Sequence, residues 1–244
     1  MIKLLALACM LVVIPAFSAA AQKYESDLFE TSAGSLRITF LGHGSLLFTL
    51  GEKTIYLDPV SQSADFSQFP KADLILLTHE HSDHLDSKAL DLLRTDKTVL
   101  VGPEACAKDT RGMQIMRNGD RQTIEGISIE AVPAYNIVHM RSPGQPFHPK
   151  GSGNGYVIAF GDKRVYVVGD TENIPEMKQL KGIDIAFLPM NLPYTMTPEM
   201  VADAAKSFRP RILYPYHYGN TDTARVVDLL KGDKDIEVRI RKLS

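Results

Sequence analysis

The sequence predicts a single α/β domain in which strands and helices form packed layers. Short segments rich in β-branched and aromatic residues occur in two groups, as expected for strands. Segments with an apolar stripe at helical spacing are interspersed among them. No fixed-period repeat, low-complexity stretch or linker divides the chain, so we expect one domain over residues 28–244.

The first group of strands is expected between residues 36 and 101. Glycine-containing turns separate its earliest members. The strand at 74–77 is a continuous apolar run, which is typical of a strand buried on both faces. The expected strands are 36–41, 45–50, 53–57, 74–77 and 98–101, with a helix at 87–93.

The second group is expected between residues 127 and 240. Its clearest element is a helix at 198–208, because Thr197 can cap it, Pro198 is allowed at its first position and apolar residues recur on one face. The expected strands are 127–132, 156–160, 164–168, 183–188, 211–214 and 236–240, with a further helix at 223–230.

Two other segments carry weaker signals. The glycine-rich segment 151–155 precedes a strand and not a helix, so we expect a flexible loop there instead of a phosphate site. The apolar residues between Met190 and Met196 are expected to cover the core, the alternative being that they line a substrate pocket.

Residues 1–21 have the features of a secretory signal peptide. Lys3 gives a positive start, residues 4–17 are almost wholly apolar, and Ala19–Ala21 provide the small residues of a cleavage site. The apolar run is shorter than the roughly 20 residues that span a bilayer. We therefore expect a periplasmic or secreted protein that begins near Gln22 and has no stable membrane insertion.

Charge and cysteine content limit the remaining classes. Loss of Lys3 with the signal peptide changes the formal charge from −2 to −3, which argues against a nucleic-acid partner and favours a small-molecule substrate. Cys9 would be lipidated in a lipoprotein, but the apolar stretch before it is short. Removal of Cys9 with the signal peptide leaves Cys106 as a single thiol, so no intramolecular disulfide can form. The sequence does not indicate an oligomeric state.

The strongest functional signal is the segment 79–84, His-Glu-His-Ser-Asp-His, directly after the strand at 74–77. Three of the seven histidines fall in these six residues, beside a carboxylate. Imidazole nitrogens and carboxylate oxygens are ligands that zinc accepts. Asp170 and His217 follow two later strands in the same way. Three strand ends with metal-competent residues favour a metal site over a solvated polar loop.

These motifs resemble the metallo-β-lactamase superfamily, particularly its ascorbate-lactonase-like and phospholipase-like hydrolases. The similarity covers nearly all of the mature chain. It rests on Leu-Gly-His-Gly-Ser at 41–45, Leu-Asp-Pro at 57–59, the 78–86 motif, Gly-Asp-Thr at 169–171 and Tyr-Pro-Tyr-His-Tyr at 214–218. The resemblance implies an αββα sandwich with two metals at one edge. It implies that the first metal is held by His79 and His81, the second by Asp83, His84 and His217, with Asp170 as a bridge.

The third ligand of the first metal departs from the family pattern. The family supplies a histidine before the bridging aspartate, and Asn136 stands where that histidine is expected. An amide oxygen is a weaker zinc ligand than imidazole. We favour His148, because Pro146 and Pro149 restrict its backbone, and leave Asn136 and His139 as alternatives.

The implied chemistry is hydrolysis with two zinc ions, Mn²⁺ or Fe being the alternatives. A metal lowers the pKa of bound water from about 15.7 to roughly 7, so hydroxide can attack a carbonyl or phosphoryl centre. Asp83 is the expected catalytic residue, which orients the nucleophile or passes a proton to the leaving group. Asp58 and His43 either orient the imidazole ligands or form turns.

We therefore predict a hydrolase that cleaves an ester, lactone or phosphodiester. A β-lactamase is one alternative, which hydrolysis of a chromogenic cephalosporin would identify. A di-iron redox or metal-binding protein on the same scaffold is the other, and its oxidised form would absorb visible light whereas a zinc protein is colourless.

Overall fold

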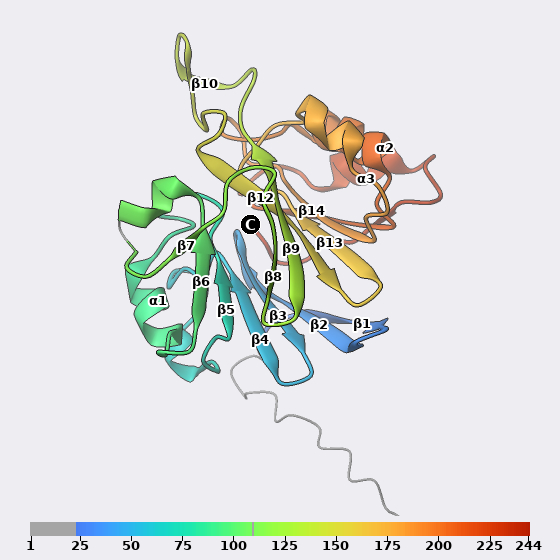
Figure 1. Cartoon of the computed structure of the whole chain (residues 1–244). Coiled ribbons are helices and arrows are strands. Elements are labelled where there is room, and N and C mark those ends of the chain that lie inside the picture. The colour runs from blue at the N-terminus through green and yellow to red at the C-terminus, as the bar shows by residue number, and fades with distance from the viewer. Residues whose placement is uncertain (1–22, 109) are drawn as a thin grey trace, which may run out of the picture.

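The computed structural model describes residues 23–108 and 110–244, which form two facing β-sheets with helices on the outer sides (Figure 1). This arrangement confirms the αββα sandwich that was expected. The proposed signal peptide at 1–21 lies outside the described residues.

The first sheet contains strands β1 to β7 in chain order. Neighbours from β1 to β4 are antiparallel, whereas β4 to β7 run parallel. Among the described residues, the strands are β1 (Ser26–Thr31), β2 (Gly34–Gly42), β3 (Ser45–Leu50), β4 (Lys53–Leu57), β5 (Leu74–Leu76), β6 (Val99–Gly102) and β7 (Gln114–Ile115).

The second sheet has the order β16-β15-β14-β13-β12-β9-β8. It too has a parallel half, β13 to β16, and an antiparallel half. Within the described part, its strands are β8 (Arg121–Ile124), β9 (Ile127–Ala134), β12 (Gly153–Phe160), β13 (Lys163–Val167), β14 (Ile185–Pro189), β15 (Ile212–Tyr216) and β16 (Glu237–Val238). A separate hairpin consists of β10 (Met140–Ser142) and β11 (Gln145–Pro146).

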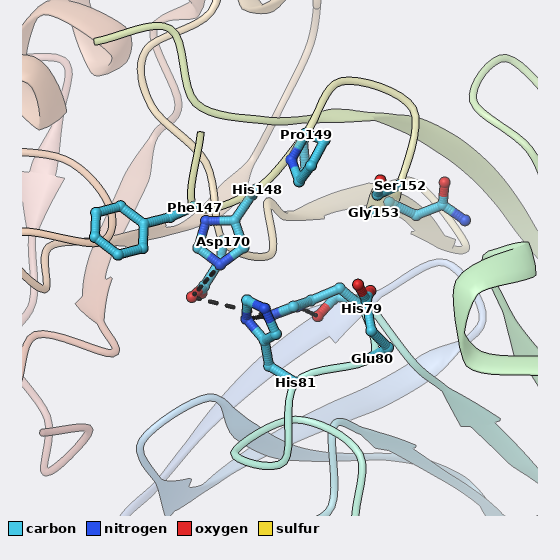
Figure 2. Close-up of a pocket in the computed structure, with 12 residues that line it drawn as sticks. His79, Glu80, His81, Phe147, His148, Pro149, Ser152, Gly153 and Asp170 are labelled. Atoms are coloured by element: carbon cyan, nitrogen blue, oxygen red, sulfur yellow. Dashed lines mark hydrogen bonds and ion pairs between the residues drawn. The ribbon is translucent and has the colours of Figure 1, made fainter. Parts of the chain in front are cut away.

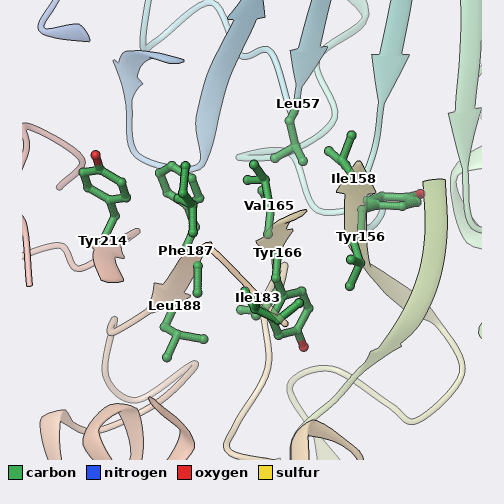
Figure 3. Close-up of a cluster of buried hydrophobic side chains, with 14 of the residues drawn as sticks. Leu57, Tyr156, Ile158, Val165, Tyr166, Ile183, Phe187, Leu188 and Tyr214 are labelled. Atoms are coloured by element: carbon green, nitrogen blue, oxygen red, sulfur yellow. The ribbon is translucent and has the colours of Figure 1, made fainter. Parts of the chain in front are cut away.

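The main core lies between the two sheets. Successive side chains of a strand point to opposite faces, so Leu57 of β4 packs in this core while its neighbour Tyr56 packs in a second core on the outer face. Figure 3 shows Leu57 facing Val165 and Ile158 of the second sheet. The prediction that the strand at 74–77 is buried on both faces is confirmed in the same way.

Helices cover the outer faces of both sheets. Helix α1 (Ser87–Leu93) packs on the first sheet, and α2 (Pro198–Phe208) and α3 (Ala224–Leu230) cover the second. Within the described residues, 3₁₀ helices occur at η2 (Phe66–Gln68), η3 (Glu104–Lys108) and η4 (Pro175–Gln179). The hydroxyl of Thr197 accepts a hydrogen bond from Met200 N at 3.1 Å, which confirms the predicted cap. In the part of the chain that is described, no helix is long and apolar enough to cross a membrane.

The prediction of a flexible loop at 151–155 is wrong for residues 153–155, because β12 begins at Gly153. Asn154 N donates to Thr78 O at 2.8 Å, so the two sheets meet here. A Cβ at Gly155 would lie 2.9 Å from Val168 O. The glycines therefore allow a close backbone approach beside the segment that leads to His79.

Candidate metal centre

The parallel halves of the two sheets direct their strand ends to one edge of the sandwich. The His79–His84 segment follows β5, Asp170 follows β13 and His217 follows β15. In the first sheet, Asp58 follows β4, the parallel neighbour of β5. Parallel strands end at the same edge of their sheet, and as a result all these residues meet although they are far apart in sequence.

The first cluster consists of His79, His81 and His148, whose ligand nitrogens all lie within 4.8 Å of one another. His79 Nε2 is 3.1 Å from His81 Nδ1. Figure 2 shows His79 and His81 facing His148, with Asp170 beside it. The structure therefore places His148 with the two histidines of the motif, where a third ligand is needed.

The second cluster contains Asp83, His84 and His217, together with His43. Asp83 Oδ2 lies 3.2 Å from His43 Nε2 and 3.5 Å from His217 Nε2. His43 comes from the turn between β2 and β3 and packs against the His217 ring, with ring centres 3.7 Å apart at 41°. His43 thus contacts the site directly. Its positive φ of 50° agrees with the expected turn, and its hydrogen bond goes to the carboxylate of Asp83, so that orientation of an imidazole ligand by His43 stays a prediction.

Asp170 lies between the two clusters. Its Oδ2 is 3.3 Å from His148 Nε2 and 3.5 Å from His217 Nε2. Its Oδ1 is 3.4 Å from His84 Nε2. One buried carboxylate therefore contacts histidines of both clusters, which is the position that a bridging ligand requires.

Hydrogen bonds to the far side of three rings fix their orientation. His84 Nδ1 is 2.8 Å from Asp58 Oδ2, and His79 Nδ1 is 3.0 Å from the hydroxyl of Thr78. That hydroxyl in turn donates to Asp58 Oδ2 at 2.5 Å. Imidazole ligands usually have their second nitrogen satisfied in this way. Asp58, which is fully buried, therefore orients two histidines and leaves their Nε2 atoms toward the clusters.

The third ring is oriented by Asn136, the residue that occupies the usual histidine position. His148 Nδ1 donates to Asn136 Oδ1 at 2.6 Å, and the backbone N of His148 donates to the same oxygen at 2.9 Å. Asn136 Nδ2 donates to Glu172 and to Tyr194 O. The amide oxygen of Asn136 is thus occupied by hydrogen bonds from His148. His139, the other alternative, lies outside the clusters with its Nδ1 2.8 Å from Glu172 Oε1.

Charges in the site favour a cation beside Asp170. Burial raises the pKa of Asp170, but the charges of His217 and His84 outweigh this effect and hold it well below its usual value. Burial lowers the pKa of His84, yet the carboxylates of Asp170 and Asp58 raise it to about 9. For His79, burial and the neighbouring His84 lower the pKa well below the usual value. The ionised carboxylate of Asp170 attracts a cation, and a divalent metal bound there would displace the proton that the carboxylates favour on His84, because imidazole binds metal in its neutral form.

The residues present fit two metal ions by a second criterion. His84 Nε2, His217 Nε2 and Asp170 Oδ1 are buried, and none forms a hydrogen bond with another described residue. Buried polar atoms without partners are costly and rare. A Cβ at Gly44 would lie 2.9 Å from His84 Cε1, so the turn before β3 leaves room for this ring. Metal ions at the two clusters would satisfy all three atoms.

A cavity of about 320 Å³ opens beside the clusters. Its lining includes Asp83, His148 and His217 of the clusters and also Arg141, Phe147 and Tyr194. The expectation that the apolar residues of 190–196 cover the core is correct for Met190 and Met196, which are fully buried. It is wrong for Leu192 and Tyr194, which are 43% and 45% exposed, and Tyr194 lines the cavity.

Sequence reasoning did not single out Arg141 or Glu172. No motif surrounds Arg141, and its position depends on the path of the loop between β9 and β12. Glu172 had one usable signal, since a carboxylate two residues after Asp170 falls at the same strand end.

Comparison with known proteins gives consistent matches. Residues 37–217 match the family model described as β-lactamase superfamily domain. A UPF0173 metal-dependent hydrolase of Thermococcus kodakarensis is 32% identical over 200 residues, which cover 75% of this chain and 84% of the relative.

Two solved structures are similar over most of the chain. One, described as a metal-dependent hydrolase from Parabacteroides distasonis, is 49% identical with a TM-score of 0.87, covering 91% of this chain and 100% of that chain. The other, the metallo hydrolase Igni18 from Ignicoccus hospitalis, is 24% identical with a TM-score of 0.69, covers 86% of this chain and 96% of that chain, and shows the same fold.

Proposed function

Because the chain belongs to the β-lactamase superfamily and, within it, to the UPF0173 metal-dependent hydrolases, we propose that it hydrolyses an ester, lactone or phosphodiester of a small molecule with two zinc ions. The observation that carries the proposal is Asp170, which contacts histidines of both clusters through its two oxygens. The signal peptide expected at 1–21 supports a periplasmic or secreted location.

The two metals have separate sets of ligands in this proposal. His79, His81 and His148 would hold the first, and Asp83, His84 and His217 the second, with Asp170 shared. When bound, zinc supplies an acidified water and a positive charge for the oxygen that becomes negative. Zinc is favoured because imidazoles make up five of the seven ligands, whereas Mg²⁺ and Ca²⁺ prefer oxygen ligands.

In this proposal, Asp83 is the residue that transfers the proton. Its side chain is 45% exposed, whereas that of Asp170 is 4% exposed. Asp83 also lines the cavity, so it can contact a substrate there. A hydrogen bond of 3.2 Å with His43 Nε2 would keep its Oδ2 in place while the carboxylate accepts a proton from water and returns it to the leaving group.

The test is metal content and turnover measured on one preparation. Protein purified without chelator should contain two zinc ions per chain, by elemental analysis, and be colourless. The zinc-loaded enzyme should hydrolyse at least one member of a panel of 4-nitrophenyl esters, lactones and phosphodiesters, and Asp170→Asn should lose both metal and activity. A metal-free preparation, or a visible iron absorption band, would contradict the zinc proposal. Hydrolysis of a chromogenic cephalosporin alone would assign a β-lactamase instead.

A further inference from the structure

The hairpin of β10 and β11 carries a cation to the cavity beside the metal clusters. Figure 1 shows this hairpin projecting from the body of the sandwich. It belongs to the loop between β9 and β12, which also contains His148. Arg141, in β10, lines the same cavity as Asp83, His148 and His217. One loop thus brings a charged side chain and a proposed metal ligand to a common space.

The side chain of Arg141 packs over the ring of Phe147, which in turn contacts Tyr194. Its guanidinium carbon lies 5.7 Å from the centre of the Phe147 ring. Phe147 meets Tyr194 edge-on, with ring centres 5.0 Å apart at 77°. Such packing orients a guanidinium and leaves its N–H groups available. Because Phe147 directly precedes His148 in the chain, the cation is held close to the first cluster.

Arg141 has no acidic partner among the described residues. The ion pairs of the structure include Arg117, Arg121, Arg209 and Arg225, all on carboxylates, but none involves Arg141. The nearby carboxylates Asp83 and Asp170 are instead engaged by histidines. The guanidinium N–H groups of Arg141 are therefore available to a ligand in the cavity.

From this geometry we propose that Arg141 forms an anion subsite, and that the substrate is a small molecule with a carboxylate or phosphate group apart from the scissile bond. The inference rests on the proposed hydrolytic function. The scissile group would lie at the clusters, the anion at Arg141, and the Phe147–Tyr194 pair would contact the part between them. A planar guanidinium binds both oxyanions with paired hydrogen bonds.

Hydrolysis of a matched pair of esters tests this assignment. 4-Nitrophenyl hexanoate and mono-4-nitrophenyl adipate share a leaving group and differ in the anion at the far end of the acyl chain, which in adipate is too distant to attack its own ester efficiently. For Arg141→Gln, we expect kcat/KM for the adipate ester to fall roughly tenfold or more, as for loss of a hydrogen bond to a charged group. The fall in kcat/KM for the hexanoate ester should be much smaller, and Arg141→Lys should be intermediate for the adipate.

Binding without turnover separates failure of the subsite from failure of the hydrolytic proposal. Phenylacetate and phenylphosphonate are titrated by calorimetry into zinc-loaded wild type, Arg141→Gln and Arg121→Gln. Arg121 is a matched control because it is exposed and paired with Glu130, away from this cavity. We expect a roughly tenfold weaker Kd in Arg141→Gln alone, larger for the preferred oxyanion.

The possible outcomes are distinct. Weaker anion binding without hydrolysis of either ester would support the subsite and count against ester hydrolysis. Equal anion affinity in wild type and Arg141→Gln, or an equal loss for both esters, would overturn the assignment of Arg141.

Discussion

Substitution of His148, Asn136 and His139 one at a time tests which of them holds the first metal. His148→Ala removes one of three imidazoles in that cluster, so we expect the protein to retain one zinc ion per chain instead of two. His139→Ala should retain both, because His139 contacts Glu172 and not the clusters. The two variants remove the same side chain, which makes His139→Ala a matched control.

Asn136→Ala should give a graded effect. It removes the oxygen that accepts from His148 Nδ1 at 2.6 Å and from His148 N at 2.9 Å. Hydrogen-bond partners of this kind typically contribute about 10- to 100-fold to metal affinity. That range corresponds to about 1.4 to 2.7 kcal/mol in the affinity for one zinc ion. We therefore expect both metals to bind to Asn136→Ala, one of them more weakly.

The assay combines elemental analysis after dialysis with zinc competition against a chromogenic chelator. Circular dichroism of each variant checks that the fold is retained. If His148→Ala kept both zinc ions with wild-type affinity while Asn136→Ala lost one completely, Asn136 would be the ligand and His148 a neighbour. Loss of one zinc ion from His139→Ala would also refute the assignment.

Asp83→Ala should abolish hydrolysis without unfolding the protein, because its carboxylate lies at the cavity and not in the core; near wild-type kcat with both metals bound would contradict this. Asp27→Asn should lower the free energy of unfolding at neutral pH by about 2 kcal/mol, as expected for lost hydrogen bonds to a charged group. Burial raises the pKa of Asp27, but hydrogen bonds from Arg241 and Tyr214 outweigh it and lower the pKa below 3.8. This stabilisation is complete above the unfolded pKa and disappears as the pH falls through the folded pKa, so urea midpoints of the two proteins should converge in acid; a constant difference would be inconsistent with it. N-terminal sequencing of the exported protein should begin near Gln22, whereas an intact Met1 would rule out cleavage.

The sequence was sufficient for elements whose signals are local. Helices α1 and α2 have the predicted bounds; Asp86 and Thr197 cap their N-terminal ends, and apolar residues recur along one face of each. Strand β1 was not predicted, since it is a half-exposed edge strand with polar residues. Its pairing with β2 is supported by Asp27, which contacts Arg241 more than 200 residues away. No local pattern can report such a contact.

The same distinction applies to the site. The motif residues could be predicted to converge because each directly follows a strand, and the ends of parallel strands meet. The positions of Arg141 and Asn136 could not be predicted in this way. Both lie in the long connection between β9 and β12, and their surroundings depend on how that connection returns to the sheet.

Glu172 explains how that connection is held. It is fully buried, and its carboxylate accepts hydrogen bonds from the backbone N of Ile137, Val138 and His139 at 2.6–2.7 Å. Burial of a charge is costly unless it is fully hydrogen-bonded. Here the bonds from the backbone and from Asn136 outweigh burial and lower the pKa of Glu172.

Hydrogen bonds between Asn136 and His148 hold the two ends of the connection together. Asn136 N donates to His148 O at 2.9 Å, and Asn136 Oδ1 accepts from His148 N and Nδ1. The segment from 137 to 147 is therefore closed at its base, with Glu172 beneath one end and His148 at the other. Arg141 and Phe147 lie within this closed segment. Because Glu172 follows Asp170 by two residues, one strand end supplies the carboxylate that contacts both histidine clusters and also anchors the loop that carries Arg141 and Phe147 to the cavity.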